Sequence, residues 1–403
     1  MSPCFRRNSA SAGLWRFALV GLMLSVAACD TDPSTLFDPD APFGPDPVIS
    51  SIAPADSALA GVSVVTITGQ NFSTTPGENL VYFGSTRAPT LSATATELTV
   101  RAPNEPSPDV TIKLAVIGAE NFSNNIAYRL NPAATSFANV GGFEEPVGVT
   151  SDSDGNLYVS MLANSVPAGI QIVTPDGARS EYASSTFRWD DLALGPDGYL
   201  YAVRNLRAVF RFPPGGGGQE TWTALADRSV RLSAITFDDA GNLWGGGGNA
   251  QIFRIAPDKS VLIVDFDGIV SDMAVFSGFL YVAVEREGVS TVERLPLDAS
   301  GNPGTVETYF SITNAVGSDF IPGNALAFAA TGELFVGTEL PDPILLVRPD
   351  GSWESLYPGV LEPTVSGLAW GPDPFLYATK TPNADLGTEA DIVRINTQLE
   401  GGR

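Results

Sequence analysis

The C-terminal part of the 403-residue chain contains a sequence repeat. Six segments share an apolar strand, a turn that contains Gly or Pro, and a Leu followed by an aromatic residue: VTSDSDGNLYV, LALGPDGYLYA, ITFDDAGNLWG, MAVFSGFLYV, LAFAATGELFV and LAWGPDPFLYA. Successive leucines of this motif lie 37 to 54 residues apart, which is the period of a four-stranded propeller blade. The repeats predict a six-bladed β-propeller over residues 134–403.

The way the ring closes can be predicted as well. Each repeat continues into a third strand, such as QIFRI or DIVRIN, and the first five continue into a fourth strand, such as SEYAS. The sixth repeat has no room for a fourth strand, whereas TSFANV at 135–140 precedes the first repeat without a partner. We expect this segment to form the outermost strand of the last blade, which removes exposed sheet edges.

The repeats are similar to known propeller families. The first repeat, with Pro146, Gly148 and Val149 ahead of DGNLYV at 154–159, resembles the NHL repeat. The later repeats resemble the wider group of gluconolactonase-like and strictosidine-synthase-like propellers. This resemblance covers residues 134–397 and implies a fold rather than one function, because propellers carry many activities.

An export and anchoring signal is predicted at the N-terminus. Three arginines precede an apolar run of 12 residues, Phe17 to Ala28, which is too short to cross a bilayer that requires about 20. The run ends in VAAC, so residues 1–28 resemble a bacterial lipoprotein signal peptide. The resemblance implies that Cys29 is acylated, palmitate being a typical chain, and that the lipid bilayer is a partner. A plain secretory signal is the alternative. Residues 29–47, rich in Pro and Asp, predict an acidic tether.

Residues 48–131 predict a β-sandwich. Short alternating runs broken by Gly, Pro and Asn are typical of such a fold: VISSIAP, SVVTITGQNF, NLVYFGS, ELTVRAP, DVTIKLAVIG and NIAYRL. The segment resembles the IPT/TIG family of immunoglobulin-like domains, through the positions Ile52, Pro54, Gly61, Gly69, Phe72, Val81, Phe83 and Gly84. The resemblance implies a spacer or a protein-binding module. The whole chain is therefore expected to be all-β, a sandwich followed by a propeller.

The composition excludes several classes of function. Acidic residues outnumber basic ones by 45 to 22, and the formal net charge is −23. A nucleic acid is therefore not expected as a partner, because its binding depends on Lys and Arg at the phosphates. The chain contains no histidine, which removes the commonest general base and the preferred ligand of zinc and copper.

Candidate binding residues are predicted at one mouth of the propeller channel. The innermost strand of each blade lines the channel, so equivalent positions at the start of these strands converge. These positions are Val147, Asp190, Ser233, Ser271, Asn324 and Ser366. With their neighbours they predict a ligand site formed by Glu144, Glu145, Asp190, Asp191, Ser271, Asp272, Asn324 and Ser366. A polar lining that only binds water and caps the backbone is the alternative.

An enzymatic alternative uses the same mouth. Gluconolactonase-like enzymes hold a divalent ion with a Glu, an Asn and an Asp, and the resemblance carries these roles onto Glu144, Asn324 and Asp190. Oxygen ligands of this kind favour calcium over a transition metal. Two departures weaken this reading: Gly148 stands where the family has Trp, and the chain order is Glu, Asp, Asn instead of Glu, Asn, Asp. No residue is predicted to be catalytic, and calcium is the one cofactor left open.

The acidic segment at 152–156 and Trp189 can also be interpreted from the sequence. The segment DSDGN at 152–156 has the composition of a calcium loop, but the other repeats have GPDG, DDAG or AATG at this place, so it is predicted to be a hairpin turn. Trp189 adjoins Asp190 and is expected to lie near the mouth.

Together these features predict a lipid-anchored protein of the bacterial cell envelope that faces the periplasm or the cell surface. The predicted role is non-enzymatic binding or scaffolding through the propeller and the IPT/TIG domain. An envelope protein or a glycan is the expected partner. The alternative is a calcium-dependent, gluconolactonase-like hydrolase with its site at the channel mouth.

Overall fold

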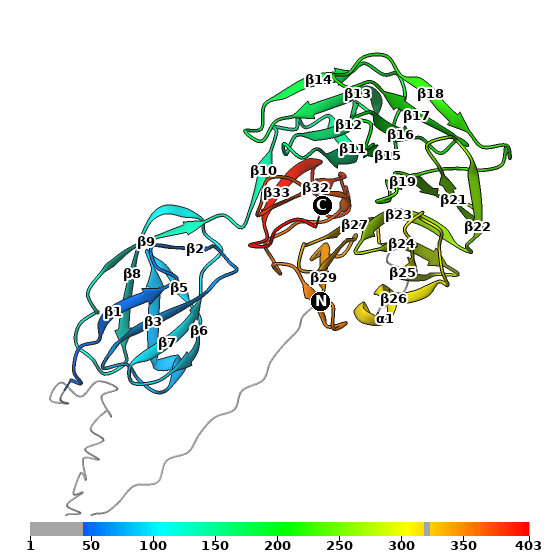
Figure 1. The fold of residues 1–403 in the computed structure, drawn as a ribbon. Coiled ribbons are helices and arrows are strands. Elements are labelled where there is room, and N and C mark those ends of the chain that lie inside the picture. Colours follow the sequence, from blue (N-terminus) through cyan, green and yellow to red (C-terminus); the bar gives the residue numbers. More distant parts are fainter. Residues whose placement is uncertain (1–42, 318–322, 403) are drawn as a thin grey trace, which may run out of the picture. The chain divides into compact units, whose positions relative to one another are not determined.

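The computed structural model describes residues 43–317 and 323–402 of the chain. The predicted signal peptide, Cys29 and nearly all of the predicted tether lie outside these residues. In the described part of the chain, no helix is long and apolar enough to cross a membrane. The described residues form an immunoglobulin-like sandwich and a six-bladed propeller, which confirms the predicted all-β fold (Figure 1).

The N-terminal domain consists of two packed sheets. One sheet has the order β1-β3-β7-β6 and the other the order β2-β9-β8-β4-β5. Alternate residues of the strands face the space between the sheets, where Val65, Ile67, Leu98 and Ile112 are fully buried. The bounds are β1 (Val48–Ala53), β2 (Ser57–Leu59), β3 (Val64–Gln70), a 3-10 turn (Pro76–Glu78), β4 (Asn79–Phe83), β5 (Thr86–Ala88), β6 (Thr90–Ala93), β7 (Glu97–Arg101), β8 (Ser107–Val116) and β9 (Ile126–Asn131).

The six predicted runs of this domain all form strands. The three strands that the sequence pattern did not indicate, β2, β5 and β6, contain only three or four residues each. Strands of this length are too short to display an alternating pattern.

The first five blades of the propeller are each a four-stranded antiparallel sheet built from consecutive strands. Blade one contains β11 (Glu144–Ser151), β12 (Leu157–Ala163), β13 (Val166–Val173) and β14 (Arg179–Ala183), and blade two contains β15 (Asp191–Leu194), β16 (Leu200–Val203), β17 (Ala208–Phe212) and β18 (Glu220–Ala224). Blade three contains β19 (Ala234–Phe237), β20 (Leu243–Gly246), β21 (Gln251–Ile255) and β22 (Val261–Asp265), and blade four contains β23 (Ile269–Phe276), β24 (Phe279–Arg286), β25 (Val289–Pro296) and β26 (Glu307–Ser311). Blade five contains β27 (Ala325–Phe328), β28 (Leu334–Gly337), β29 (Ile344–Val347) and β30 (Trp353–Ser355). A short helix, α1 (Ile312–Val316), follows β26.

The sixth blade joins the two ends of the domain. It contains β31 (Val365–Trp370), β32 (Phe375–Lys380) and β33 (Asp391–Asn396), and its outermost strand is β10 (Ala134–Phe137). β10 pairs with β33 in antiparallel register, from Ala134 opposite Ile395 to Phe137 opposite Ile392. The predicted closure is therefore confirmed, and β33 lies between β10 and β32 (Figure 1).

The repeated Leu of the sequence motif marks the core of every blade. These six side chains have 0% of their surface exposed: Leu157, Leu200, Leu243, Leu280, Leu334 and Leu376. Each is the first or second residue of the second strand of its blade, where it belongs to a hydrophobic core cluster. The period of the sequence therefore reports one buried anchor per blade.

Removal of the aromatic anchor of the closing strand should destabilise the propeller. Phe137 is 7% exposed, and its ring lies 4.8 Å from that of Tyr377. We expect Phe137→Ala to lower the free energy of unfolding by about 3–5 kcal/mol, because the ring leaves a cavity at the closure. Denaturant unfolding measures this loss.

The matched control is Phe143→Ala, because Phe143 is 79% exposed. A change of no more than about 0.5 kcal/mol is expected at such a surface position. Equal effects of the two substitutions would contradict the role of β10 in closure.

Candidate functional site

The propeller channel contains a cavity of about 340 Å³. Its walls are the innermost strands of all six blades, β11, β15, β19, β23, β27 and β31. Six of the eight predicted site residues line it: Asp190, Asp191, Ser271, Asp272, Asn324 and Ser366. Glu144 and Glu145 are not among the lining residues.

Two kinds of backbone geometry present polar side chains at the mouth. In blades four and six, the pairing of the inner strand shifts at Ser271 and Ser366, so each of these residues is the extra residue of a β-bulge. In blades two and five, Asp190 and Asn324 stand directly before the inner strand, and each backbone N–H still donates to the neighbouring strand. These four residues therefore do not follow the regular alternation of side chains between the two faces of the sheet, and all four lie at the same end of the channel.

The channel changes character beyond this polar mouth. One step further along each inner strand, the lining residues are aliphatic or Met: Val149, Leu192, Ile235, Met273, Leu326 and Leu368. Trp370 and Gly402 line the cavity as well. Gly402 donates its N–H to Phe328 O, so the C-terminal segment is fastened to blade five. Further along, the lining is mixed and includes Thr150, Ser151 and Thr236. The cavity therefore has polar side chains at the mouth, a ring of six aliphatic or Met side chains next to them, and both kinds beyond.

Two carboxylates bridge neighbouring blades. Asp191 accepts a hydrogen bond from its neighbour Leu192 N at 2.8 Å and another from Ile235 N of blade three at 2.7 Å. Asp272 repeats this arrangement, with Met273 N at 2.8 Å and Leu326 N of blade five at 2.6 Å. Each carboxylate thus satisfies a backbone donor near the start of the next inner strand, which is an edge strand and has no neighbouring strand on that side.

Both carboxylates are partly buried in the channel wall, and both have a raised pKa. Burial raises the pKa of Asp191 well above its ordinary value, and the charge of Asp272 raises it further. Burial also raises the pKa of Asp272, to about 7. The backbone donors oppose these shifts but do not cancel them, because loss of solvent around a charged carboxylate costs more than two hydrogen bonds return.

The remaining predicted mouth residues also link parts of the ring. Asn324 Nδ2 donates to Val365 O of blade six at 3.2 Å, and Ser271 donates to Gly323 O ahead of blade five. Ser366 Oγ lies 3.1 Å from Thr379 Oγ1 within its own blade. Asp190 forms an ion pair with Arg188 at 3.1 Å, and 24% of its side chain is exposed.

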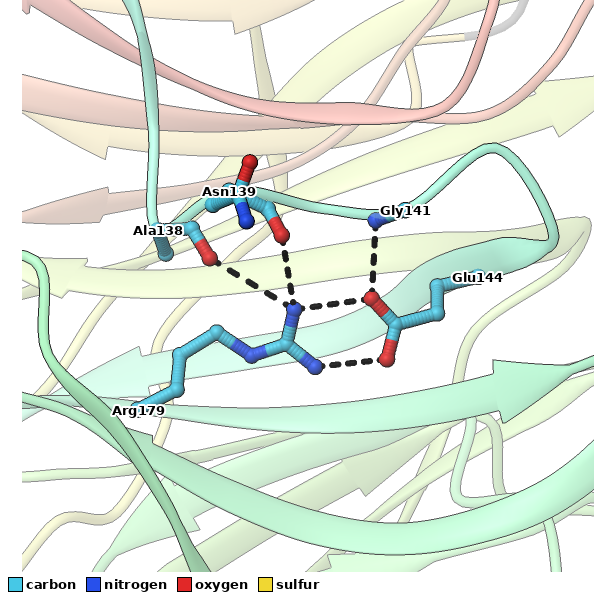
Figure 2. A network of polar contacts seen from close by, with 5 residues as sticks. All are labelled: Ala138, Asn139, Gly141, Glu144 and Arg179. Carbon is cyan, nitrogen blue, oxygen red and sulfur yellow. Dashed lines mark hydrogen bonds and ion pairs between the residues drawn. The ribbon is translucent and has the colours of Figure 1, made fainter.

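Glu144 was expected at the mouth but is engaged elsewhere. Its carboxylate forms a two-pronged ion pair with Arg179 at 2.7 and 2.8 Å and accepts a hydrogen bond from Gly141 N at 2.8 Å (Figure 2). Arg179 also donates to Asn139 O, so the pair fixes the loop before β11 against β14. The Arg179 guanidinium lowers the pKa of Glu144. The structure thus places Glu144 outside the cavity lining, and its partner Arg179, 35 residues further along the chain, could not be inferred from the local sequence pattern.

The residues present do not fit the calcium ion that the lactonase resemblance implies. Glu144 is held by Arg179, Asp190 by Arg188, and Asn324 turns its amide nitrogen to Val365 O. Within residues 43–317 and 323–402, no group of three or more Asp, Glu, Cys or His side chains could hold a metal ion. Calcium coordination requires six to eight oxygen ligands, and the three assigned residues do not converge to supply them.

The acidic loop at 152–156 is a turn, as predicted. Asp152 accepts hydrogen bonds from Asp154 N, Asn156 N, Asn156 Nδ2 and Tyr158 Oη, at 2.8 to 3.1 Å. Gly155 has φ +80°, which a Gly tolerates without strain. Asp238 makes the equivalent set of bonds in blade three, including one from Trp244 Nε1. The carboxylates of Asp152 and Asp238 therefore hold their own turns together.

Trp189 does not lie at the mouth, contrary to expectation. It is fully buried and donates its indole N–H to Ser185 Oγ at 3.1 Å. The ring packs against Phe210 and Phe212 of β17. Its neighbour Asp190 does line the channel, so two adjacent residues face opposite environments.

Comparison with family models places an IPT/TIG domain at residues 47–129. This confirms the resemblance expected for the N-terminal domain. No curated protein matches the sequence of the chain.

Solved structures share the fold. An auxiliary nutrient binding protein from Bacteroides thetaiotaomicron matches with a TM-score of 0.52 at 12% identity, covering 91% of this chain and 99% of that one. A putative gluconolactonase matches with a TM-score of 0.52 at 19% identity, covering 67% and 93%. Regucalcin from Agrobacterium tumefaciens, described as a calcium-binding protein, matches with a TM-score of 0.51 at 16% identity, covering 66% and 92%. At these identities the likeness establishes the fold alone.

The partly buried carboxylate of Asp272 predicts a pH dependence of stability. Because its pKa rises from 3.8 to about 7 on folding, the folded protein binds the proton more tightly than the unfolded chain. The free energy of unfolding should therefore fall as pH rises from about 4 to about 7. We expect Asp272→Asn to reduce this fall by roughly 1–3 kcal/mol, as measured by urea unfolding across that range.

Asp298→Asn is the control, because Asp298 is an exposed turn residue whose pKa is lowered by its hydrogen bonds from Asn302 and Ser300. It should retain the fall. An identical pH profile in wild type and Asp272→Asn would refute the assignment.

Proposed function

We propose that the chain is a lipid-anchored, non-enzymatic binding protein of the bacterial cell envelope. Its propeller mouth binds a small, neutral, hydroxyl-rich molecule such as a saccharide. The observation that carries this proposal is the channel cavity, which has polar groups from several blades at its mouth and six aliphatic or Met side chains two residues further along the inner strands. Its volume of about 340 Å³ lies within the range of small-molecule sites, roughly 300–1,000 Å³.

The chemistry of the mouth favours a neutral ligand over an anion. Among the described residues that line the cavity there is no Lys or Arg. An anion would therefore find no positive countercharge in the lining, and it would lie beside Asp190, which is paired with Arg188, and beside Asp272, whose pKa of about 7 leaves it partly ionised. Hydroxyl groups of a sugar can donate to Asp190 and exchange hydrogen bonds with Ser271, Asn324 and Ser366.

Binding without turnover agrees with how the carboxylates are used. Asp191 and Asp272 each accept two backbone N–H groups that hold adjacent blades. A general base must be free to reach the proton that it abstracts, and movement of either carboxylate would leave an inner strand without its acceptor. The fold shared with an auxiliary nutrient binding protein is in keeping with this role.

Anchoring is proposed from the sequence around Cys29. The apolar run that ends in VAAC resembles a lipoprotein signal, and the following stretch is rich in Pro and Asp. Acylation of Cys29 would hold the chain at a membrane, and the acidic segment would separate the folded domains from it.

Saccharide binding can be tested by calorimetry with the full chain. We expect a neutral methyl glycoside or disaccharide to bind saturably, and the corresponding uronate to bind at least tenfold more weakly. Asp190→Ala and Asn324→Ala should each weaken the neutral ligand about tenfold, through loss of one hydrogen bond to a polar group.

Asp298→Ala, in an exposed turn, serves as the matched control and should bind like wild type. If neutral saccharides do not bind, or if a sugar lactone is hydrolysed in an Asp190-dependent manner, the proposed function is wrong.

Anchoring can be tested separately by Cys29→Ser. We expect this substitution to abolish fatty-acid labelling and to shift the protein from the membrane fraction to the soluble fraction. Cys4→Ser is the control and should change neither result. Unaltered labelling in Cys29→Ser would exclude lipidation at this residue.

A further inference from the structure

A second cavity lies apart from the channel, against the last blade. Its volume is about 170 Å³, and it shares no lining residue with the channel cavity. One wall is the face of the sheet β10-β33-β32-β31, and the segment Val360–Glu362 and Ile344 of blade five form the other. The saccharide site proposed above does not involve these residues.

Strand register explains the chemistry of the sheet wall. Ser136, Val393 and Ala378 are cross-strand partners and share one face. Lys380 and Asp391 are direct partners one step along the same face. The wall is therefore apolar along most of its length and charged at one end.

The apolar end is deeply buried. Ile344 and Ile395 are 0% exposed, Ala378 is 1% and Val365 is 2% exposed. An apolar cavity of about 150 Å³ is large enough to admit a molecule the size of benzene. The cavity can therefore take an alkyl group of about five carbons.

The charged end meets solvent. Lys380, whose side chain is 7% exposed, forms an ion pair at 2.7 Å with Glu362, whose side chain is 68% exposed. Asp391 accepts hydrogen bonds from Ser136 Oγ at 3.0 Å and from Ile392 N at 2.8 Å, and both donate to Oδ1. For Oδ2, no donor is present among the described residues.

The charges at this end do not balance. Lys380 contributes one positive charge, while Glu362 and Asp391 contribute two negative charges. Lys380, the cross-strand partner of Asp391, acts on its carboxylate electrostatically, but the Lys380 ammonium donates its hydrogen bond to Glu362. Asp391 is therefore a partly exposed carboxylate whose Oδ2 is open to a ligand that donates a hydrogen bond. Such a group is stabilised most by a cation that donates hydrogen bonds to it.

We propose that this cavity binds a small aliphatic amine, with its ammonium group on Asp391 and its alkyl group against Ile344, Val365, Ala378 and Ile395. The ammonium completes the hydrogen bonds of Asp391 and balances the charge of the cluster. The alkyl group fills the apolar end. The net negative charge of the protein attracts such a cation to the surface.

The test is calorimetric titration of the full chain with 3-methylbutylamine. Two molecules of the same size separate the contributions: 3-methylbutanol lacks the charge, and 3-methylbutanoate reverses it. We expect the amine to bind saturably at one site, the alcohol to bind at least tenfold more weakly, and the acid not to bind. An acid or alcohol that binds as tightly as the amine would overturn the proposal.

Variants locate the site. Asp391→Asn should weaken amine binding at least tenfold, and Ala378→Leu, which fills the apolar end, should abolish it. Asp385→Asn, an exposed acid between β32 and β33, and Asp190→Ala in the channel should leave it unchanged. Melting temperatures show whether each variant is folded. Amine binding that survives both Asp391→Asn and Ala378→Leu in folded protein, or that is lost in Asp190→Ala, would refute the assignment.

Discussion

The antiparallel pairing of β10 with β33 is the contact on which the propeller depends. Five blades are made from consecutive strands, but the sixth requires a strand from the beginning of the domain. Without β10, β33 would present a free edge and the apolar face of the last blade would lose its cover, including the ring of Phe137 against Tyr377. The pairing therefore converts an open row of sheets into a closed ring, and only a closed ring has a central channel.

Two partly buried carboxylates, Asp191 and Asp272, link the blades around the channel, although loss of solvent around a charged carboxylate is energetically unfavourable. Asp191 and Asp272 are drawn into the ring because the start of an inner strand leaves a backbone N–H without a ladder partner. A carboxylate side chain can span the gap between blades and accept two N–H groups at once. The cost is a raised pKa and mutual repulsion between the two acids. The blades that lack such an Asp have Gly148, Ala234, Ala325 and Gly367 at the equivalent position, so the bridges occur in only part of the ring.

The sequence predicts the fold of this chain better than its site. The repeat period, the turn residues and the repeated Leu are local signals in the sequence. Because every blade repeats them, a blade with a weak signal can be assigned from the others. Strand closure also follows from counting strands. The positions of side chains near the mouth depend instead on partners from other segments of the chain. Arg179 forms an ion pair with Glu144 and holds it away from the cavity. Trp189 is buried against Ser185, Phe210 and Phe212. One sequence signal could have identified the bridging role of Asp191 and Asp272. Both occupy the position directly after the mouth residue of their blade, where the other four blades have Gly or Ala.

The closing strand also has a mechanical meaning. The chain enters the propeller through β10, directly after the sandwich domain ends at Asn131. Any tension transmitted along the backbone from the N-terminal side therefore acts first on the four residue pairs that join β10 to β33. Because these strands are antiparallel neighbours at the rim of one blade, such a load would open the ring at its seam while the other five blades keep their own hydrogen bonds. The pairing of β10 with β33 is thus the contact that would break first under such a load.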